Sequence, residues 1–82
     1  MPLFLDTHPA QPGVTAEEAA ATHRKDLAVQ AKYGVRYIKY WFDPITGKVF
    51  CLSEAPSAEA IQKIHTRNGI PPAEIYELTL EV

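Results

Sequence analysis

The sequence lacks most of the residues and patterns that commonly reveal what a protein does. Its 82 residues include one cysteine, Cys51, so no disulfide can form within the chain, which fits a reducing compartment. No apolar run approaches the ~20 residues that a membrane-spanning helix requires. The opening residues MPLFL lack the basic segment of a secretory signal peptide and are followed at once by polar residues. We therefore expect a cytoplasmic protein that makes no contact with a membrane.

Basic residues and familiar site motifs are scarce as well. Lys and Arg total 8 against 10 Asp and Glu, and they form no basic stripe of the kind that neutralises phosphates, so we expect no nucleic-acid partner. The chain also has no Cys-x-x-Cys, no His-Glu-x-x-His, no phosphate-binding glycine loop and no nucleophilic serine elbow. Zinc fingers, zincins, nucleotide enzymes and α/β-hydrolases therefore receive no support.

The chain is short enough to form one domain, residues 1–82. A domain of this size buries only ~60% of the surface that its unfolded chain exposes. Association with a second copy would therefore add stability.

Helix and strand signals alternate along the first half of the chain. Residues 2–7, PLFLDT, are typical of a short strand that ends before the proline- and glycine-containing residues 8–13. Thr15 and Glu18 have the spacing of a capping box, which predicts a helix that Gly34 ends. Residues three or four apart are expected to form the buried face of this helix: Ala16, Ala20, His23, Leu27 and Ala31.

The second half predicts a hairpin, a helix and a last strand. Residues 35–42 and 48–53 are rich in β-branched and aromatic side chains and flank a turn that contains proline and glycine. Ser57 is expected to cap a helix that Asn68-Gly69 closes, and residues 75–82 alternate apolar with polar side chains, as a half-buried strand does. The inner face of this helix is predicted to contain Ala58, Ile61, Ile64 and His65.

The resulting order, β-α-β-β-α-β, is that of a ferredoxin-like α+β fold, in which two helices cover one face of an antiparallel sheet. Pairing the two ends of the turn sets the hairpin register. Tyr40 then lies opposite Cys51, Trp41 lies opposite Phe50, and Tyr37 lies beside Glu54. Because both faces of the hairpin carry large apolar side chains, we expect the open face of the sheet to form a homodimer.

Cys51 is the first candidate for a site. In the predicted register it shares a hairpin face with Ile38, Tyr40 and Phe42, and a buried free cysteine is most often a structural residue. A functional interpretation requires a partner. His23 and His65 are both predicted to face the same side of the sheet, and thiolate with imidazole suits nickel, copper or zinc. Histidines that are simply hydrogen-bonded in the core would give the same pattern.

Two further candidates lie outside that set. Glu54 follows Cys51 by three residues, so it points to the opposite face unless the strand bends. His8 follows Asp6 by two residues at the end of the first strand, in a stretch that is expected to be exposed. Such a pair can bind a divalent cation weakly, although exposed residues of this kind are more often solvated surface.

An enzyme is the alternative hypothesis. His23 could act as a general acid or base in a small pocket between helix and sheet, roofed by Tyr40 and Trp41, as in an isomerase or cofactor-free oxygenase of the dimeric α+β barrel type. One histidine in an apolar stripe is the basis for that hypothesis. A third possibility is a dimeric structural module.

Three segments together resemble a known family. They are His23-Arg24-x-Asp26, Phe-Cys-Leu-x-Glu-Ala-Pro at residues 50–56, and His65-x-x-Asn-Gly-x-Pro71. The chain is similar over nearly its whole length to the small nickel-binding ferredoxin-like domains of actinobacteria. The resemblance implies a homodimer that binds nickel ions and serves as a cytoplasmic sink for excess metal, without catalysis. This chain departs from that family at Lys39, where relatives often carry histidine, and at His8, which belongs to none of its motifs. Surface metal sites at the periphery of the dimer, built from His8, Asp6 or exposed Glu residues, are therefore an alternative.

Together, residue chemistry and this resemblance give five candidate metal ligands. They are His8, His23, Cys51, Glu54 and His65.

Overall fold

The computed structural model describes residues 1–9, 11–70, 72 and 74–81. Pro71 of the third segment above and Val82 of the predicted last strand lie outside the described residues. The elements in chain order are β1 (Leu3–His8), α1 (Ala16–Val29), the 3-10 helix η1 (Gln30–Tyr33), β2 (Arg36–Phe42), β3 (Val49–Glu54), α2 (Ala58–Arg67) and β4 (Glu74–Leu78).

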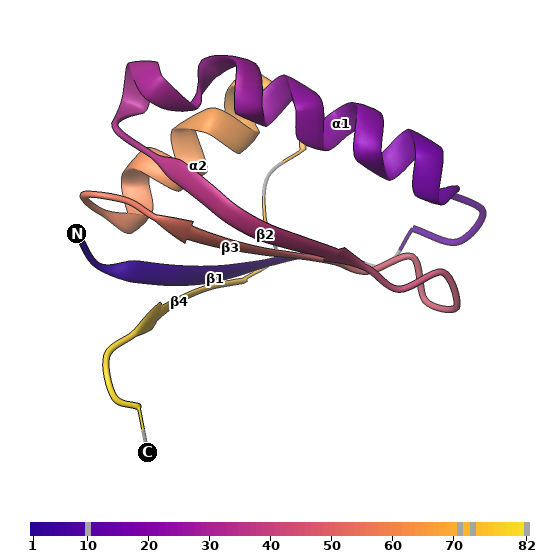
Figure 1. Ribbon diagram of the computed structural model, residues 1–82. Helices are drawn as coiled ribbons and strands as arrows, with labels where there is room; N and C mark the ends of the chain where they lie inside the picture. The colour runs from indigo at the N-terminus through magenta and orange to yellow at the C-terminus, as the bar shows by residue number, and fades with distance from the viewer. Residues whose placement is uncertain (10, 71, 73, 82) are drawn as a thin grey trace.

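These elements form two layers, a four-stranded sheet and a pair of helices (Figure 1). The strand order is β2-β3-β1-β4, and every neighbouring pair is antiparallel. Both helices lie over the same face of the sheet, as Figure 1 shows. The predicted ferredoxin-like β-α-β-β-α-β arrangement is therefore confirmed. No helix in the described part of the chain is long and apolar enough to cross a membrane.

Side chains cap both helices where the sequence predicts. The Thr15 hydroxyl accepts a hydrogen bond from the Glu18 amide at the start of α1, and the Ser57 hydroxyl accepts one from the Ala60 amide at the start of α2. At its end α1 tightens into η1, and Gly34, with φ 69°, ends that turn in the left-handed conformation that glycine adopts without strain.

The buried face of α1 differs from the predicted one. Ala19 and Asp26 are its buried residues, whereas Leu27, predicted to be buried, is 38% exposed. Asp26 turns inward because it accepts a hydrogen bond from Asn68 Nδ2 at 2.6 Å and contacts His65. A face made of alanines and one buried carboxylate has little hydrophobic contrast, so the 3.6-residue period does not reveal it.

The face of α2 agrees closely with the prediction. Ile61, Ile64 and His65 are at most 1% exposed and rest on the sheet, while Ala58 packs at the edge of the core. The other buried members of this core are Phe4, Val35, Tyr37, Cys51, Ala55 and Ala60.

The hairpin register is confirmed near the turn and wrong farther from it. Tyr40 pairs with Cys51 and Trp41 with Phe50, as predicted. An irregularity between Tyr37 and Lys39 then inserts one extra residue, Ile38.

This bulge shifts the start of β2. Tyr37 pairs with Ser53 and is 8% exposed, while Arg36 takes the predicted place of Tyr37 opposite Glu54. Ile38, which was expected to share the buried face of Cys51, is 38% exposed. The shift brings a second tyrosine under the helices.

The last strand is shorter than predicted, ending at Leu78. Its Ile75 packs against the core, and Tyr76 and Leu78 lie on the outer side of the sheet, where they pair with Leu5 and Leu3 of β1. Leu80, predicted to belong to this strand, follows it and is 82% exposed.

Candidate metal centre

Four side chains with metal-binding donors meet between the sheet and the helices. Asp6 and His8 come from β1, Cys51 from β3 and His65 from α2, and one ligand atom from each lies within 4.8 Å of all the others. Their exposed fractions are 0%, 7%, 1% and 1%. We call these four residues the donor cluster.

The backbone of each element explains this convergence. Asp6 and His8 are two residues apart on β1 and therefore share a face, and Asp6 pairs directly with Cys51 on the neighbouring strand. His65 follows Ile64 on the buried face of α2, and from there it reaches the sheet. The bulge at Ile38 adds Tyr37, whose hydroxyl oxygen lies 3.4 Å from His65 Nε2.

His65 is held between two carboxylates. Its Nε2 lies 2.6 Å from Asp6 Oδ2, and its Nδ1 lies 3.2 Å from Asp26 Oδ2. Burial alone would lower the pKa of His65, but the hydrogen bonds with Asp26 and Asp6 outweigh burial and raise that pKa to about 9. In the metal-free protein His65 is thus an imidazolium at neutral pH.

Burial and neighbouring groups also shift the pKa values of Asp6 and Cys51. Burial would raise the pKa of Asp6, yet its hydrogen bonds with His65 and His8 lower that pKa below its usual value. Burial raises the pKa of the Cys51 thiol, and the negative charges of Asp6 and Asp26 raise it further. The thiol is therefore neutral at physiological pH.

His8 completes the cluster, and its burial contradicts the exposed position expected for it. Its Nε2 lies 3.3 Å from Asp6 Oδ2, and its ring meets the His65 ring edge-on with centroids 4.5 Å apart. The expectation was wrong because β1 runs through to His8, whose side chain then points into the core with Asp6.

The donor cluster fits a divalent transition metal. Imidazole nitrogens, a thiolate and a carboxylate are the donors that nickel, copper and zinc accept in proteins. Three buried atoms of the cluster, His8 Nδ1 and both carboxylate oxygens of Asp6, make no hydrogen bond of good geometry among the described residues, although Asp6 Oδ2 lies within ion-pair distance of both histidines. Asp26, on Nδ1 of His65, stands where a carboxylate typically orients a ligating histidine.

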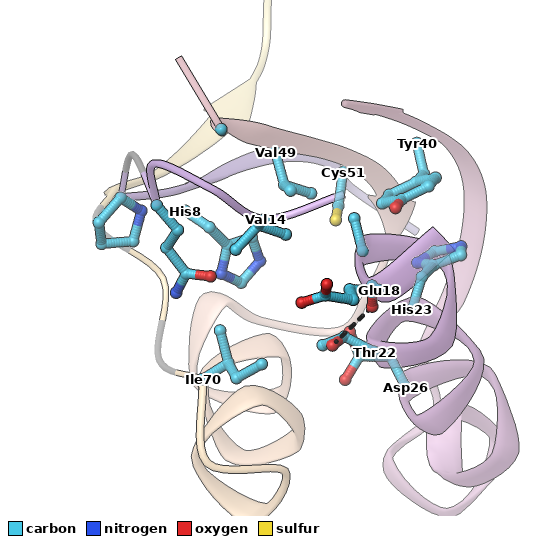
Figure 2. Close-up of a pocket in the computed structure, with 14 residues that line it drawn as sticks. His8, Val14, Glu18, Thr22, His23, Asp26, Tyr40, Val49, Cys51 and Ile70 are labelled. Atoms are coloured by element: carbon cyan, nitrogen blue, oxygen red, sulfur yellow. Dashed lines mark hydrogen bonds between the residues drawn. The ribbon is translucent and has the colours of Figure 1, made fainter. Parts of the chain in front are cut away.

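A cavity of about 110 Å³ adjoins the cluster between α1 and the β2–β3 hairpin. His8 and Cys51 line it from the sheet, and His23 and Asp26 line it from α1, as Figure 2 shows. The cavity therefore connects the donor cluster with the surface beside α1.

His23 lies on this cavity rather than in the cluster. Its ring stacks on that of Tyr40, with centroids 4.2 Å apart and planes 9° apart. Burial lowers the pKa of His23, and the charge of Asp26 opposes this only in part. Tyr40 lines the cavity as expected, but Trp41 does not, because it points to the other face of the hairpin and is 48% exposed.

Glu54 lies away from the cluster. It ends β3, where its carboxylate pairs with the exposed guanidinium of Arg36 across the hairpin. The structure therefore brings His8, Cys51 and His65 of the five candidates together, with His23 nearby and Glu54 apart.

Two acidic residues at this site were not among the candidates. Asp6 was noted only as the partner of an exposed His8, although its position between Phe4 and His8 in a strand would have placed it on the buried face. Asp26 stands three residues after His23, but no local pattern links it with His65 or Asn68, which are about forty residues away.

The chain is similar to known proteins in both sequence and fold. Residues 4–78 match the family described as nickel responsive protein SCO4226-like. The crystal structure of SCO4226 from Streptomyces coelicolor A3(2) is 40% identical in sequence, the alignment covers 98% of this chain and 99% of that one, and the TM-score is 0.91. No match was found among curated proteins. The chain therefore belongs to the SCO4226-like family of nickel responsive proteins.

Proposed function

We propose that this protein binds nickel as a cargo ion through Asp6, His8, Cys51 and His65, and that it sequesters excess nickel in the cytoplasm as a homodimer. The observation that carries the proposal is the convergence of four buried donors within 4.8 Å of one another. The donor types restrict the ion to borderline transition metals, and the family description favours nickel among them.

Binding at this cluster exchanges protons for the metal. At neutral pH the metal-free cluster carries a proton on His65 Nε2 and another on the Cys51 thiol, and both must leave for these atoms to act as ligands. The Nδ1 proton of His65 can remain and donate to Asp26, which keeps the ring oriented. Nickel affinity is thus expected to decrease as pH falls.

The burial of the donors supports storage. All four are at most 7% exposed, so an ion held there is shielded from water and from competing ligands. The single cysteine, buried and unpaired, suits a reducing cytoplasm.

The outer face of the sheet supports the homodimer. Trp41, Tyr76 and Leu78 are 48%, 47% and 45% exposed, and β-sheet pairing aligns Leu78 with Leu3 on that face. No helix covers this face within the described chain, as Figure 1 shows. An apolar sheet face of this kind is typical of a subunit interface.

Calorimetric titration of the purified metal-free protein with nickel tests the proposal. We expect saturable binding together with a near-ultraviolet thiolate-to-nickel charge-transfer band. Cys51→Ser should abolish the band, and His8→Ala should weaken binding at least tenfold, a loss of ~1.4 kcal/mol or more, because it removes a proposed ligand. Glu54→Gln, which alters a carboxylate outside the cluster, should leave both readouts unchanged.

Two results would contradict the proposal. One is heat no greater than that of a chelator-matched blank. The other is a nickel affinity that survives Cys51→Ser and His8→Ala but is lost in Glu54→Gln or in His23→Gln, which would move the site to the other candidate ligands.

The enzyme hypothesis retains one favourable observation, the cavity beside His23 and Tyr40. At about 110 Å³ it is well below the ~300 Å³ at which pockets for drug-sized ligands usually begin. Nickel binding is the better supported function.

A further inference from the structure

The lining residues define the walls and the opening of the cavity beside the donor cluster. Val14, Val49 and Ile70 give it apolar walls, and His8 and Cys51 open it to the cluster. Glu18 also lines it and is itself exposed, so this carboxylate stands at the opening. Figure 2 shows His8 at the left of the cavity, His23 at the right and Cys51 above, between the two.

The size of the cavity limits its occupant. An apolar cavity of ~150 Å³ can hold a benzene molecule, whereas a water occupies ~30 Å³ of liquid. At about 110 Å³ the cavity accepts a few waters or one ring slightly smaller than benzene. A five-membered ring fits this limit.

The polar atoms of the cavity determine the chemistry of that ring. Tyr40 Oη and His23 Nδ1 are buried, lie beside the cavity and have no hydrogen-bond partner within the described residues. Both can accept a hydrogen bond, His23 in the tautomer that is protonated on Nε2. An occupant with one N–H donor would satisfy one of them.

The charges around the cavity disfavour anions. Glu18 and Asp26 line it, and Asp6 pairs with Cys51 on the neighbouring strand. The described lining residues include neither Lys nor Arg. A neutral ring that has one nitrogen donor for a metal and one N–H group meets every condition. Imidazole is the smallest such ring.

We propose that this cavity is a binding site for an imidazole ring, with one ring nitrogen facing the donor cluster and the ring N–H directed at Tyr40 Oη or His23 Nδ1. The proposal rests on nickel binding at the cluster. It implies that nickel is loaded or released by exchange with an imidazole-bearing ligand. That ligand is either a free small molecule or a histidine side chain of a peptide.

Titration of nickel-loaded protein with imidazole tests the proposal. We expect a saturable shift of the nickel spectrum while nickel stays on the protein through a desalting column. Metal-free protein should bind imidazole at least tenfold more weakly. Histidine with blocked amino and carboxyl groups forms the second arm, since equal binding points to a peptide side chain and imidazole binding alone points to a free small molecule.

Ala19→Leu provides the structural control. Ala19 is 6% exposed and lines the cavity, so the larger side chain fills part of it and should weaken imidazole binding at least tenfold with nickel binding retained. Ala28→Leu makes the same change on the exposed side of α1 and should have no effect. If Ala19→Leu does not fold by circular dichroism, Val14→Phe at the same cavity replaces it.

The outcomes separate the two proposals. A protein that shows the nickel band but no response to imidazole, or an Ala19→Leu variant that binds imidazole as the wild type does, overturns the imidazole site alone. Absence of the nickel band in the wild type overturns the metal site as well.

Discussion

At the scale of single residues, the central feature is His65 between Asp6 and Asp26. All three residues are at most 3% exposed, so water does little to stabilise their charges, and each charge depends mainly on the other two. The arrangement is stable without metal as an imidazolium between two carboxylates. It can also accept a metal, because the ring can exchange its Nε2 proton for an ion while Asp26 holds Nδ1.

The first prediction concerns the pH dependence of stability in the metal-free protein. The pKa of His65 is about 9 in the folded state and 6.5 in its reference state. A raised folded pKa gives stability that is fully present below pH 6.5 and is lost as pH rises through 9. Between pH 7 and 9 we expect the free energy of unfolding to decrease by about 2 kcal/mol. Urea denaturation at the two pH values measures this decrease in the free energy of unfolding.

His65→Gln serves as the control for this prediction. It should remove most of the decrease, leaving only the smaller contribution of Cys51, whose raised pKa acts in the same direction above its own reference value. Stability that stays level or increases from pH 7 to 9 in the wild type would show that His65 is neutral in the folded protein.

The second prediction concerns Asp26 as a positioning residue. Asp26→Asn removes the carboxylate that accepts from His65 Nδ1, and loss of such a partner typically weakens metal binding 10–100-fold. The charge-transfer band of Cys51 should persist, because Asp26 is not among the proposed ligands. Glu17→Gln, which removes an exposed carboxylate from the same helix, should leave nickel affinity unchanged. Equal affinities for wild type and Asp26→Asn would refute the role.

At the scale of elements, two irregular features shape the site. The bulge at Ile38 turns Tyr37 toward His65, and the turn at Gly47 brings the β2–β3 hairpin against the loop after β1. A Cβ atom added to Gly47 would lie 2.4 Å from the carbonyl oxygen of Gln11. Both Gln11 and Gly47 line the cavity, so this close approach closes one side of it.

Gly47→Ala tests that contact. The backbone clash adds to the cost of φ +76°, so we expect a loss of more than ~2 kcal/mol of stability. Gly69→Ala has a similar φ of +80° but meets nothing within 4 Å, and should cost only about 1 kcal/mol. Urea unfolding of the two variants gives the difference. If both variants lose the same free energy of unfolding, the close contact between Gly47 and Gln11 makes no difference to stability.

At the scale of the whole molecule, the two faces of the sheet have different roles. One face, under the helices, holds the core and the donor cluster. The other carries a row of partly exposed apolar side chains that includes Trp41, Tyr76 and Leu78. A small domain gains stability by covering such a face with a second copy.

We therefore predict that Leu78→Lys converts a dimer into a monomer, because it places a charge in the apolar row. Sedimentation velocity or light scattering measures the mass. Leu27→Lys is the matched control, since Leu27 is also partly exposed, at 38%, but lies on α1 away from that face, and it should leave the mass unchanged. A wild-type protein that sediments as a monomer at micromolar concentration would contradict the prediction.

Local signals in the sequence predicted much of the fold. The Thr15 and Ser57 caps, the face of α2 and the pairing of Tyr40 with Cys51 all depend on residues within one or two turns of one another, or on one tight turn. The face of α1 was mispredicted, because Asp26 is buried by contacts with residues of α2 and its C-cap rather than by its own hydrophobicity.

The sequence by itself determined the order of the elements, their caps and the presence of one thiol and three histidines. Only the tertiary structure decided which of these side chains share a site. Asp6 and Cys51 are 45 residues apart and Cys51 and His65 are 14 apart, so no local spacing along the chain encodes their contact. Their distance depends on strand pairing between β1 and β3 and on the packing of α2 over both, and these interactions are non-local.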